Sequence, residues 1–260
     1  MTDKTIDRQY SGLEIAVIGM AGRFPSAESV DDFWDNLVAG VEGISHFDDA
    51  ELLATGVSQE LLSDSRYVRS KGAFPGIEYF DAAFFGYTPA DATILDPQVR
   101  ALHEEVYHAL EDAGYSAERR SEAIGLFLGA TNNLAWETHT LRRHIEQTGV
   151  VFTGIQLNDK DFAATRIAYS LGLTGPAFTL HTACSTSLVA IDMACRNIWT
   201  GSCQIALAGG SGLTLPHKRG YLYQENLVYS PDGHCRPFDS SAGGTVEGNG
   251  VGVVVLKRLE

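Results

Sequence analysis

The chain has 260 residues, of which 44% are hydrophobic and 20% are charged. This composition is typical of a soluble globular protein with a full core, in one large domain or two closely packed halves. The net charge of −14 argues against nucleic acid or an anionic membrane as partner, because such a surface would need a local basic patch. The candidate patches are Arg119–Arg120, Arg142–Arg143 and Lys218–Arg219. Such pairs are more often solvated than functional, although each could meet an acidic protein.

No apolar run approaches the roughly 18 residues that a membrane span needs, and residues 1–12 lack the apolar core of a signal peptide. We therefore expect a cytoplasmic protein. The cysteines form no CxxC pair and no Cys/His cluster at zinc-ligand spacing, so neither a disulfide framework nor a metal site is expected. One cysteine could be special for its reactivity, and the others are expected to be small buried side chains. The four are Cys184, Cys195, Cys203 and Cys235.

The first elements are a strand and a short helix. The segment Leu13–Met20 is apolar and rich in β-branched residues, which predicts a buried strand. The glycines that follow it lack the GxGxxG spacing, which favours a tight turn over a dinucleotide-binding loop. Ser29 can cap a helix over Val30–Val38, with an apolar face formed by Phe33, Trp34 and Leu37. The stretch from Gly43 to Pro89 is loop-rich, and we expect it to wrap over the core or a partner subunit.

The clearest helix opens at Asp96-Pro97 and closes at Gly114. Its expected buried positions recur at helical spacing and are Val99, Leu102, Val106, Ala109, Leu110 and Ala113. The later elements, in chain order, are a strand over Ala123–Ala130, a loop, a helix over Lys160–Leu171, a strand over Ala177–Ala183, a helix over Ser185–Trp199 with Leu188, Ile191, Cys195 and Ile198 on its buried face, and strands over Cys203–Gly210 and Gly250–Leu259. Five apolar strands interleaved with helices predict an α/β protein with a mostly parallel, buried sheet.

Cys184 joins the strand over Ala177–Ala183 to the helix over Ser185–Trp199, among small and hydroxylic residues. The free N–H groups and the dipole of a first helical turn favour negative charge, so they would stabilise a reactive thiolate here. The same N–H groups can donate to the oxyanion that forms when a thioester is attacked. The alternative is that Cys184 only fills a crowded corner, although alanine or glycine would do so without a reactive sulfur.

The segment HTACSTSLVAID resembles the nucleophile motif of the β-ketoacyl synthases, and the chain as a whole resembles the ketosynthase domain of modular polyketide synthases. The supporting segments occur in the order of that family over residues 13–260. They are IAVIGMAGRFPSA, FFGYTPADATILDPQ, ALEDAGY, NDKDFAATRIAYSLGLTGP, LAGGSGLTL, YSPDGHCRPFD and GVGVVVLKRLE.

This resemblance implies a thiolase-like layered fold (α-β-α-β-α), of which the chain would be the N-terminal half with a mostly parallel five-stranded sheet. Residues 1–12 would be a linker, and residues 13–260 the N-terminal region of the synthase. Cys184 would accept an acyl chain from the phosphopantetheine arm of an acyl carrier protein for decarboxylative Claisen condensation with a malonyl-type extender. The resemblance also implies a homodimer and no directly bound cofactor.

The chain departs from the family pattern in its histidines. Two catalytic histidines belong to the motifs EAHGTGT and NxGH, which would follow Glu260, so we expect this chain to lack the groups for condensation and to expose apolar core faces. His181 is three residues before Cys184, but a continuous strand would point the two to opposite faces, so we expect a structural or supporting role. For His234, in a variable loop, we expect no catalytic role. We also assign no catalytic role to the segment NDKDFAATR.

A finer resemblance points to ketosynthases of hybrid peptide–polyketide or trans-acyltransferase assembly lines. By position in the motif, Tyr223 and Asn226 would border the acyl channel, although aromatic-rich loops are also common packing elements. Two other functions stay open. One is another enzyme of the thiolase superfamily, acting on coenzyme A thioesters, and the other is a non-catalytic dimerisation or scaffold fragment.

Overall fold

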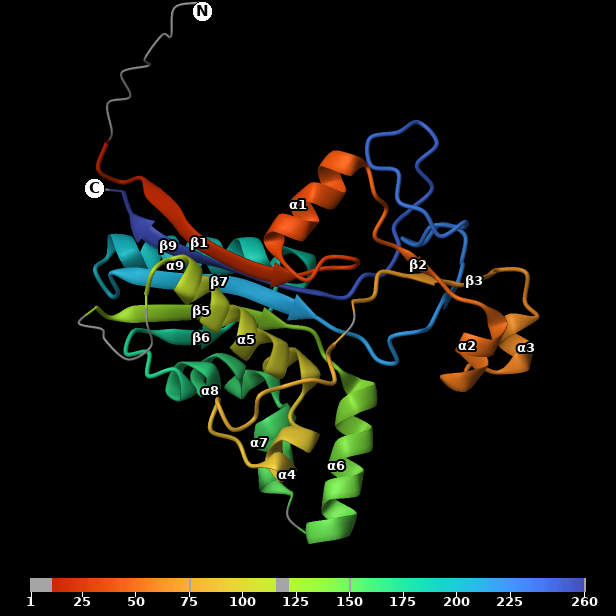
Figure 1. Cartoon of the computed structure of the whole chain (residues 1–260), viewed down its shortest axis with the longest axis horizontal. Helices are drawn as coiled ribbons and strands as arrows, with labels where there is room; N and C mark the ends of the chain where they lie inside the picture. Colours follow the sequence, from red (N-terminus) through yellow and green to blue (C-terminus); the bar gives the residue numbers. More distant parts are fainter. Residues whose placement is uncertain (1–10, 75, 116–121, 150, 260) are drawn as a thin grey trace, which may run out of the picture.

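The computed structural model describes residues 11–74, 76–115, 122–149 and 151–259 (Figure 1). The expected linker over residues 1–12 lies almost wholly outside these residues, as does the pair Arg119–Arg120. The centre of the molecule is a five-stranded sheet in the order β1-β9-β7-β5-β6. Its strands are β1 (Ile15–Arg23), β5 (Ile124–Ala130), β6 (Ala177–Thr179), β7 (Ile205–Gly212) and β9 (Gly250–Arg258).

Strand direction in this sheet is mostly parallel, as predicted. The strands β7, β5 and β6 pair in parallel, whereas β9 runs antiparallel to both of its neighbours, β7 and β1. Four strands therefore share one direction, and β9 alone is reversed. Every predicted strand is present, although β6 ends at Thr179 and not at Ala183.

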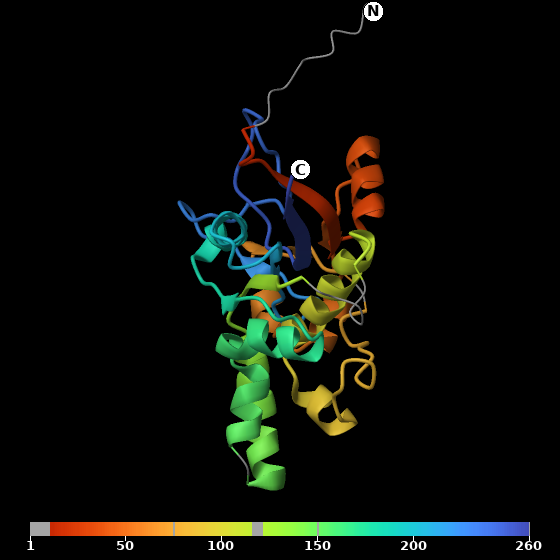
Figure 2. The same ribbon diagram turned by 90° about the vertical axis from the view of Figure 1, so that its left-hand side faces the viewer.

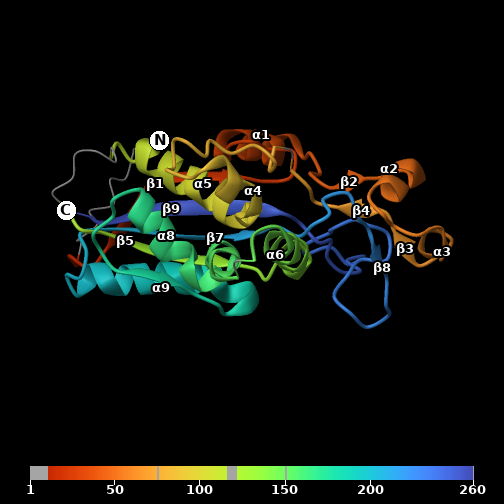
Figure 3. The same ribbon diagram turned by 90° about the horizontal axis from the view of Figure 1, so that it is seen from below.

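Helices cover both faces of the sheet (Figure 3). On one face lie α5 (Pro97–Asp112) and α8 (Ala163–Ser170), and on the other lies α9 (Thr186–Trp199). Alternate residues of β5 point to opposite faces, so Leu126 joins the core under α5 and Phe127 the core under α9. All the apolar positions predicted for α5 are buried except Ala113, which is half-buried.

Asp96 and Pro97 start α5 as the sequence predicts. The Asp96 carboxylate accepts a hydrogen bond from the Gln98 N–H at 2.8 Å, and proline occupies the first helical position, where no N–H is needed. The helix over Lys160–Leu171 is also present, but its first residues form a 3₁₀ turn, η1 (Lys160–Phe162), before α8.

One predicted apolar face is largely exposed, and another is exposed at one position. Helix α1 (Val30–Ala39) is capped by Ser29 as predicted, but the side chains of Trp34 and Leu37 are 65% and 55% exposed. In α9, Ile198 is buried, and Ile191 and Cys195 are half-buried against the same core, whereas Leu188 is 73% exposed. Ala190 and Ala194 are fully buried beside Ile198, so the side of α9 that faces the sheet combines small and large apolar residues.

The stretch from Gly43 to Pro89 is more ordered than the sequence suggests. It holds β2 (Ser45–His46), α2 (Asp49–Ala54), α3 (Gln59–Leu62), β3 (Tyr67–Val68) and β4 (Ser70–Lys71). β2 pairs with β4, and β3 pairs with β8 (Tyr221–Leu222). These elements enclose a small core of their own and form a lobe beyond one end of the sheet (Figure 3).

The predicted loop before Lys160 also contains helices. They are α6 (Leu134–Thr148) and α7 (Phe152–Asn158), and α6 projects away from the sheet (Figure 2). A short helix, α4 (Pro89–Ile94), precedes α5. Within the described parts of the chain, no helix combines the length and apolar character that crossing a bilayer requires.

Asp96 should make stability depend on pH. Its side chain is 3% exposed, and burial raises its pKa to about 6 from an ordinary value of 3.8. The folded chain keeps this proton where the unfolded chain has lost it, so the contribution of Asp96 to the free energy of unfolding falls as pH rises through this range. Asp96→Asn keeps a capping oxygen and removes the ionisable group.

We expect the stability of Asp96→Asn relative to the parent chain to increase by about 1 kcal/mol between about pH 5 and about pH 7.5. Urea denaturation at the two pH values measures this difference. A stability difference that is the same at both pH values, or that shrinks as pH rises, would contradict the assignment.

Candidate active site

Cys184 lies in a 3₁₀ turn, η2 (Ala183–Ser185), that leads directly into α9. Its side chain is exposed. The prediction that Cys184 directly follows the strand is wrong, because β6 ends at Thr179 and the chain turns before η2. Ala183 has a φ of 52°, in the left-handed region that residues with a Cβ seldom occupy. Strain of this kind persists where the surroundings hold the backbone in place, and it is frequent at functional sites.

Hydroxyl groups on both sides of Cys184 hold this turn. The Ser185 hydroxyl donates to the Thr182 carbonyl at 2.7 Å, and the Thr186 hydroxyl donates to the Ala183 carbonyl at 2.7 Å. The Thr182 N–H in turn donates to the Thr186 hydroxyl at 3.0 Å. The small and hydroxylic residues around Cys184 are therefore the bracing of its backbone.

The N–H groups at the start of the helix are partly engaged. The Ser185 N–H donates to the Thr182 carbonyl at 3.3 Å, and the Thr186 N–H donates to the Ala183 carbonyl. The sequence suggested that the first turn would offer open N–H groups to an oxyanion, but these two already close the 3₁₀ turn. An oxyanion at Cys184 would need other donors or a rearranged turn.

The start of α9 packs against a glycine near the end of each of two strands. A Cβ on Gly129, in β5, would overlap the Thr186 methyl group and would lie 3.2 Å from the Leu180 carbonyl oxygen. A Cβ on Gly210, in β7, would lie 3.3 Å from the Ser187 hydroxyl. The glycines allow the helix to approach the sheet closely, and this approach positions the Cys184 turn.

Cys184 opens onto a groove of about 1080 Å³. Residues of β1, β7 and β9 line it, including Met20, Gly210 and Val254. Further lining residues come from α1 and α9, among them Phe33 and Ile191. The groove has the size of an ordinary ligand pocket, and the cysteine lies among its lining residues.

His181 lines the same groove as Cys184. The expectation that the two side chains point to opposite faces required a continuous strand, and the strand ends before both residues. Partial burial, together with the nearby Lys160 ammonium, lowers the pKa of His181 and favours its neutral form. Lys160 itself lines the groove and donates a hydrogen bond to the Asn132 side chain there, so the segment NDKDFAATR contributes a residue to the groove.

Tyr223 and Asn226 follow β8 in the lobe. The Tyr223 N–H donates to the Arg66 carbonyl at 2.9 Å, and Asn226 is exposed with a φ of 65°. Among the described residues that line the groove, neither of the two is found. Their role beside an acyl channel stays a prediction.

The other cysteines differ in their surroundings. Cys203 is buried and Cys195 is half-buried, and burial raises the pKa of both thiols. Cys235 is exposed, so the prediction of a buried side chain is wrong for it. It lies in the loop between β8 and β9.

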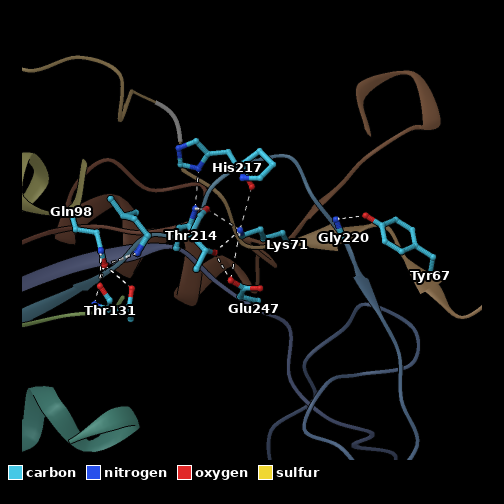
Figure 4. Close-up of polar contacts among 11 residues, drawn as sticks. Tyr67, Lys71, Gln98, Thr131, Thr214, His217, Gly220 and Glu247 are labelled. Carbon is cyan, nitrogen blue, oxygen red and sulfur yellow. Dashed lines mark hydrogen bonds and ion pairs between the residues drawn. The ribbon is translucent and has the colours of Figure 1, made fainter. Parts of the chain in front are cut away.

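A buried polar network at the end of the sheet was missed by the sequence analysis (Figure 4). Lys71 is 3% exposed, and its ammonium donates to the Thr214 carbonyl at 3.0 Å and to the Thr214 hydroxyl at 2.6 Å. Burial lowers the pKa of Lys71, and the Glu247 carboxylate lies 3.8 Å from its ammonium. Lys71 lies in the two-residue strand β4, which is too short to leave a periodic signal, so the sequence alone did not point to it.

Gln98 links α5 to the ends of two strands in a separate set of hydrogen bonds nearby (Figure 4). Its side-chain oxygen accepts from the Thr131 N–H at 3.0 Å and from the Leu213 N–H at 3.3 Å, and its amide donates to the Thr131 carbonyl at 2.9 Å. These bonds hold the ends of β5 and β7 together at the rim of the groove. In the sequence, the signal for this contact was the position of Gln98, a polar residue beside the apolar positions of a buried helix.

Comparison with known proteins identifies a family. The model of the family described as "Beta-ketoacyl synthase, N-terminal domain" matches residues 13–260. The chain is 46% identical over 253 residues to a phenolphthiocerol/phthiocerol polyketide synthase of Mycobacterium tuberculosis, covering 94% of this chain and 17% of that protein. It is 36% identical over 253 residues to polyketide synthase PksN of Bacillus subtilis, covering 96% of this chain and 4% of that protein.

Solved structures show the same relationship. Ketosynthase twelve of the bacillaene polyketide synthase of Bacillus amyloliquefaciens is similar with a TM-score of 0.86 and 32% identity, covering 96% of this chain and 44% of that one. The ketosynthase from module 1 of the bacillaene synthase of the same species is similar with a TM-score of 0.78 and 32% identity, covering 96% of this chain and 43% of that one. The chain therefore spans less than half of these structures and less than a fifth of the two polyketide synthases.

The contact between Gly129 and Thr186 can be tested with a pair of substitutions. In Gly129→Ala the new methyl overlaps the Thr186 methyl, so Thr186 must rotate and lose its hydrogen bonds to the turn. We expect the free energy of unfolding to fall by about 1 to 3 kcal/mol. We also expect the alkylation rate of Cys184 by iodoacetamide to change.

Thr186→Ser supplies the matched background, because it removes the methyl and keeps the hydroxyl. In the Thr186→Ser background, Gly129→Ala should lower the free energy of unfolding much less than in the parent chain. A double-mutant cycle would then show a clear coupling between the two positions. Gly212→Ala is the control, since its Cβ would meet only the Thr131 methyl at 3.7 Å. Equal costs of Gly129→Ala in both backgrounds would show that this contact does not hold the turn.

Proposed function

Because the chain belongs to the β-ketoacyl synthase family, whose N-terminal domain model it matches over residues 13–260, we propose that it carries the acyl-accepting half of a polyketide ketosynthase site. Cys184 is the nucleophile. The observation that carries this proposal is its exposed side chain in a strained, hydroxyl-braced turn on a groove of about 1080 Å³. A cysteine that only fills a corner would be enclosed by its neighbours.

The proposed reaction at this residue is a thioester exchange. The Cys184 thiolate attacks the carbonyl carbon of an acyl thioester, and the tetrahedral intermediate collapses by breaking the bond to the donor sulfur. The donor leaves as a thiolate and takes up a proton, while the acyl group stays on Cys184. In the following condensation, a malonyl-type extender loses CO₂ to form an enolate, which attacks the Cys184 thioester and regenerates the thiolate.

We assign no residue of this chain to decarboxylation, since none of its eight histidines lies in the motifs expected for that step. His181 takes a supporting role. Its lowered pKa favours a neutral ring in the groove, which avoids placing a second positive charge beside Lys160. Tyr223 and Asn226 remain candidates for contacts with a longer acyl chain.

The proposed acyl donor is the phosphopantetheine arm of an acyl carrier protein. The two relatives described above are polyketide synthases, which supports a carrier over coenzyme A. A phosphopantetheine arm is the substrate carrier here and not a resident cofactor. The cytoplasmic location expected from the sequence stays a prediction.

We propose that the chain dimerises through the β6 edge of the sheet. β6 is the last strand in the order β1-β9-β7-β5-β6, and Phe178 on it is 49% exposed. Leu188 of α9 is 73% exposed, and exposed apolar groups at an unpaired edge favour association with a second copy. A scaffold that only dimerises is the competing function, and the exposed, braced Cys184 argues against it.

The acyl-transfer proposal predicts a covalent adduct on Cys184. Incubation with an acylated carrier protein should add one acyl group, and tryptic mass spectrometry should place it on Cys184. We expect the adduct to disappear in Cys184→Ala and to persist in Cys235→Ala, the matched control with a second exposed thiol. The same acyl group on coenzyme A should transfer at least about tenfold more slowly, because carrier contacts lower the barrier.

Three results would count against this proposal. An adduct that survives in Cys184→Ala would remove the assigned nucleophile. Faster transfer from coenzyme A than from the carrier protein would favour the other thiolase-type function. No adduct from either donor, with the chain folded, would favour the scaffold.

A further inference from the structure

A second cluster of reactive side chains lies in the lobe, away from the Cys184 groove. Glu42, His46 and His234 each offer a ligand atom, and these atoms lie within 4.8 Å of one another. None of the three is among the residues that line the groove. Glu42 and His46 are exposed and His234 is half-buried, so an ion can reach them from solvent.

The fold brings these residues together through β4. His46 and Ser70 are direct cross-strand partners in the β2–β4 pair, which lies beside β3 and β8 in Figure 3. Gly233 packs onto Ser70 so closely that a Cβ would overlap the serine hydroxyl, and its φ of 79° suits glycine. His234 follows directly, and its ring centroid lies 5.2 Å from that of His46.

The loop that carries His234 is anchored on both sides. The Ser230 hydroxyl donates to the Asp232 carboxylate at 2.8 Å, and the same carboxylate accepts from the His234 N–H at 3.2 Å. The Tyr221 hydroxyl donates to the Ser230 carbonyl at 2.7 Å. The two histidine rings are therefore neighbours because of backbone packing and hydrogen bonds, not because of a flexible surface contact.

The His46 ring already has a hydrogen-bond partner of the kind that metal-binding histidines use. The Nδ1 atom of His46 lies 2.8 Å from the Ser70 hydroxyl, which leaves its Nε2 atom for another ligand. The Nδ1 atom of His234 lies 2.8 Å from a Glu42 carboxylate oxygen, so His234 and Glu42 would bind the ion in place of this hydrogen bond. A carboxylate, two imidazoles and one open position for water match a four-coordinate zinc site.

We propose that Glu42, His46 and His234 form a site for a divalent transition metal of the zinc type. Imidazole ligands favour Zn²⁺, Ni²⁺ or Co²⁺, whereas Mg²⁺ and Ca²⁺ require sets dominated by oxygen. The bound ion joins the segment before and within β2 to the loop between β8 and β9. It thereby stabilises the loop that carries Tyr223 and Asn226, and the site is independent of the proposed acyl transfer.

The test is Zn²⁺ titration of the full chain, without a histidine tag, followed by calorimetry. We expect one equivalent to bind and the thermal midpoint to rise. Co²⁺ in place of Zn²⁺ should give the visible absorption of a low-coordinate nitrogen and oxygen site. Hydrogen exchange of residues 223–245 should slow when the metal is added.

Substitutions at the cluster separate this site from other ligands. His46→Ala and His234→Ala should each weaken Zn²⁺ binding by about tenfold or more. Glu42→Gln, at an exposed position where folding is not at risk, should also weaken it. His139→Ala, an exposed histidine on α6, and Cys235→Ala, the thiol next to His234, should leave the affinity unchanged.

The proposal is overturned if the parent chain binds no Zn²⁺. It is also overturned if the affinity survives both histidine substitutions, or if Cys235→Ala abolishes it. Circular dichroism of each variant shows whether lost binding reflects the missing ligand or a misfolded chain. Should a histidine variant misfold, the Glu42→Gln affinity decides, and an unchanged value rejects the site.

Discussion

The site depends on one constraint: the first turn of α9 packs closely against glycines near the ends of β5 and β7. Gly129 leaves room for the Thr186 methyl, and Gly210 leaves room for the Ser187 hydroxyl, so α9 begins almost in contact with β5 and β7. This proximity holds η2 above the sheet, where hydroxyl groups brace a left-handed Ala183. A Cβ at Gly129 would displace the Thr186 side chain and break the hydrogen bonds that hold the Cys184 turn.

The same close approach explains how the two faces of the sheet differ. Helix α9 packs Ala190, Ala194 and Ile198 against β5 and β7, and its Leu188 is exposed. It leaves part of β9 and β1 uncovered on its own face, and the groove follows those strands. One packing arrangement thus produces the exposed Cys184, the groove beside it and the exposed apolar surface from which we infer a partner subunit.

The sheet was predictable because each strand is an apolar run between turn residues, and α5 was predictable because Asp96-Pro97 is a strong local start signal. Details that depend on distant contacts were not. An apolar or neutral run continues to Ala183, yet β6 ends at Thr179, and the side to which Leu188 points depends on the sheet under α9. The short strands of the lobe exist only as pairs, such as β2 with β4, between segments that carry no signal alone. Cys184 was predicted from its place before a helix and from the motif around it, whereas Lys71 and the cluster of His46 and His234 become apparent only in the folded chain.

The most direct test of how this packing creates the site is a crystal structure of the chain with an acyl group trapped on Cys184. We expect the acyl chain to lie in the groove beside Gly210 and Ile191, with η2 and the Thr186 hydrogen bonds unchanged. An acyl chain directed into solvent, or a Cys184 adduct that forms only after α9 has moved off Gly129, would contradict the claim that this packing creates the site.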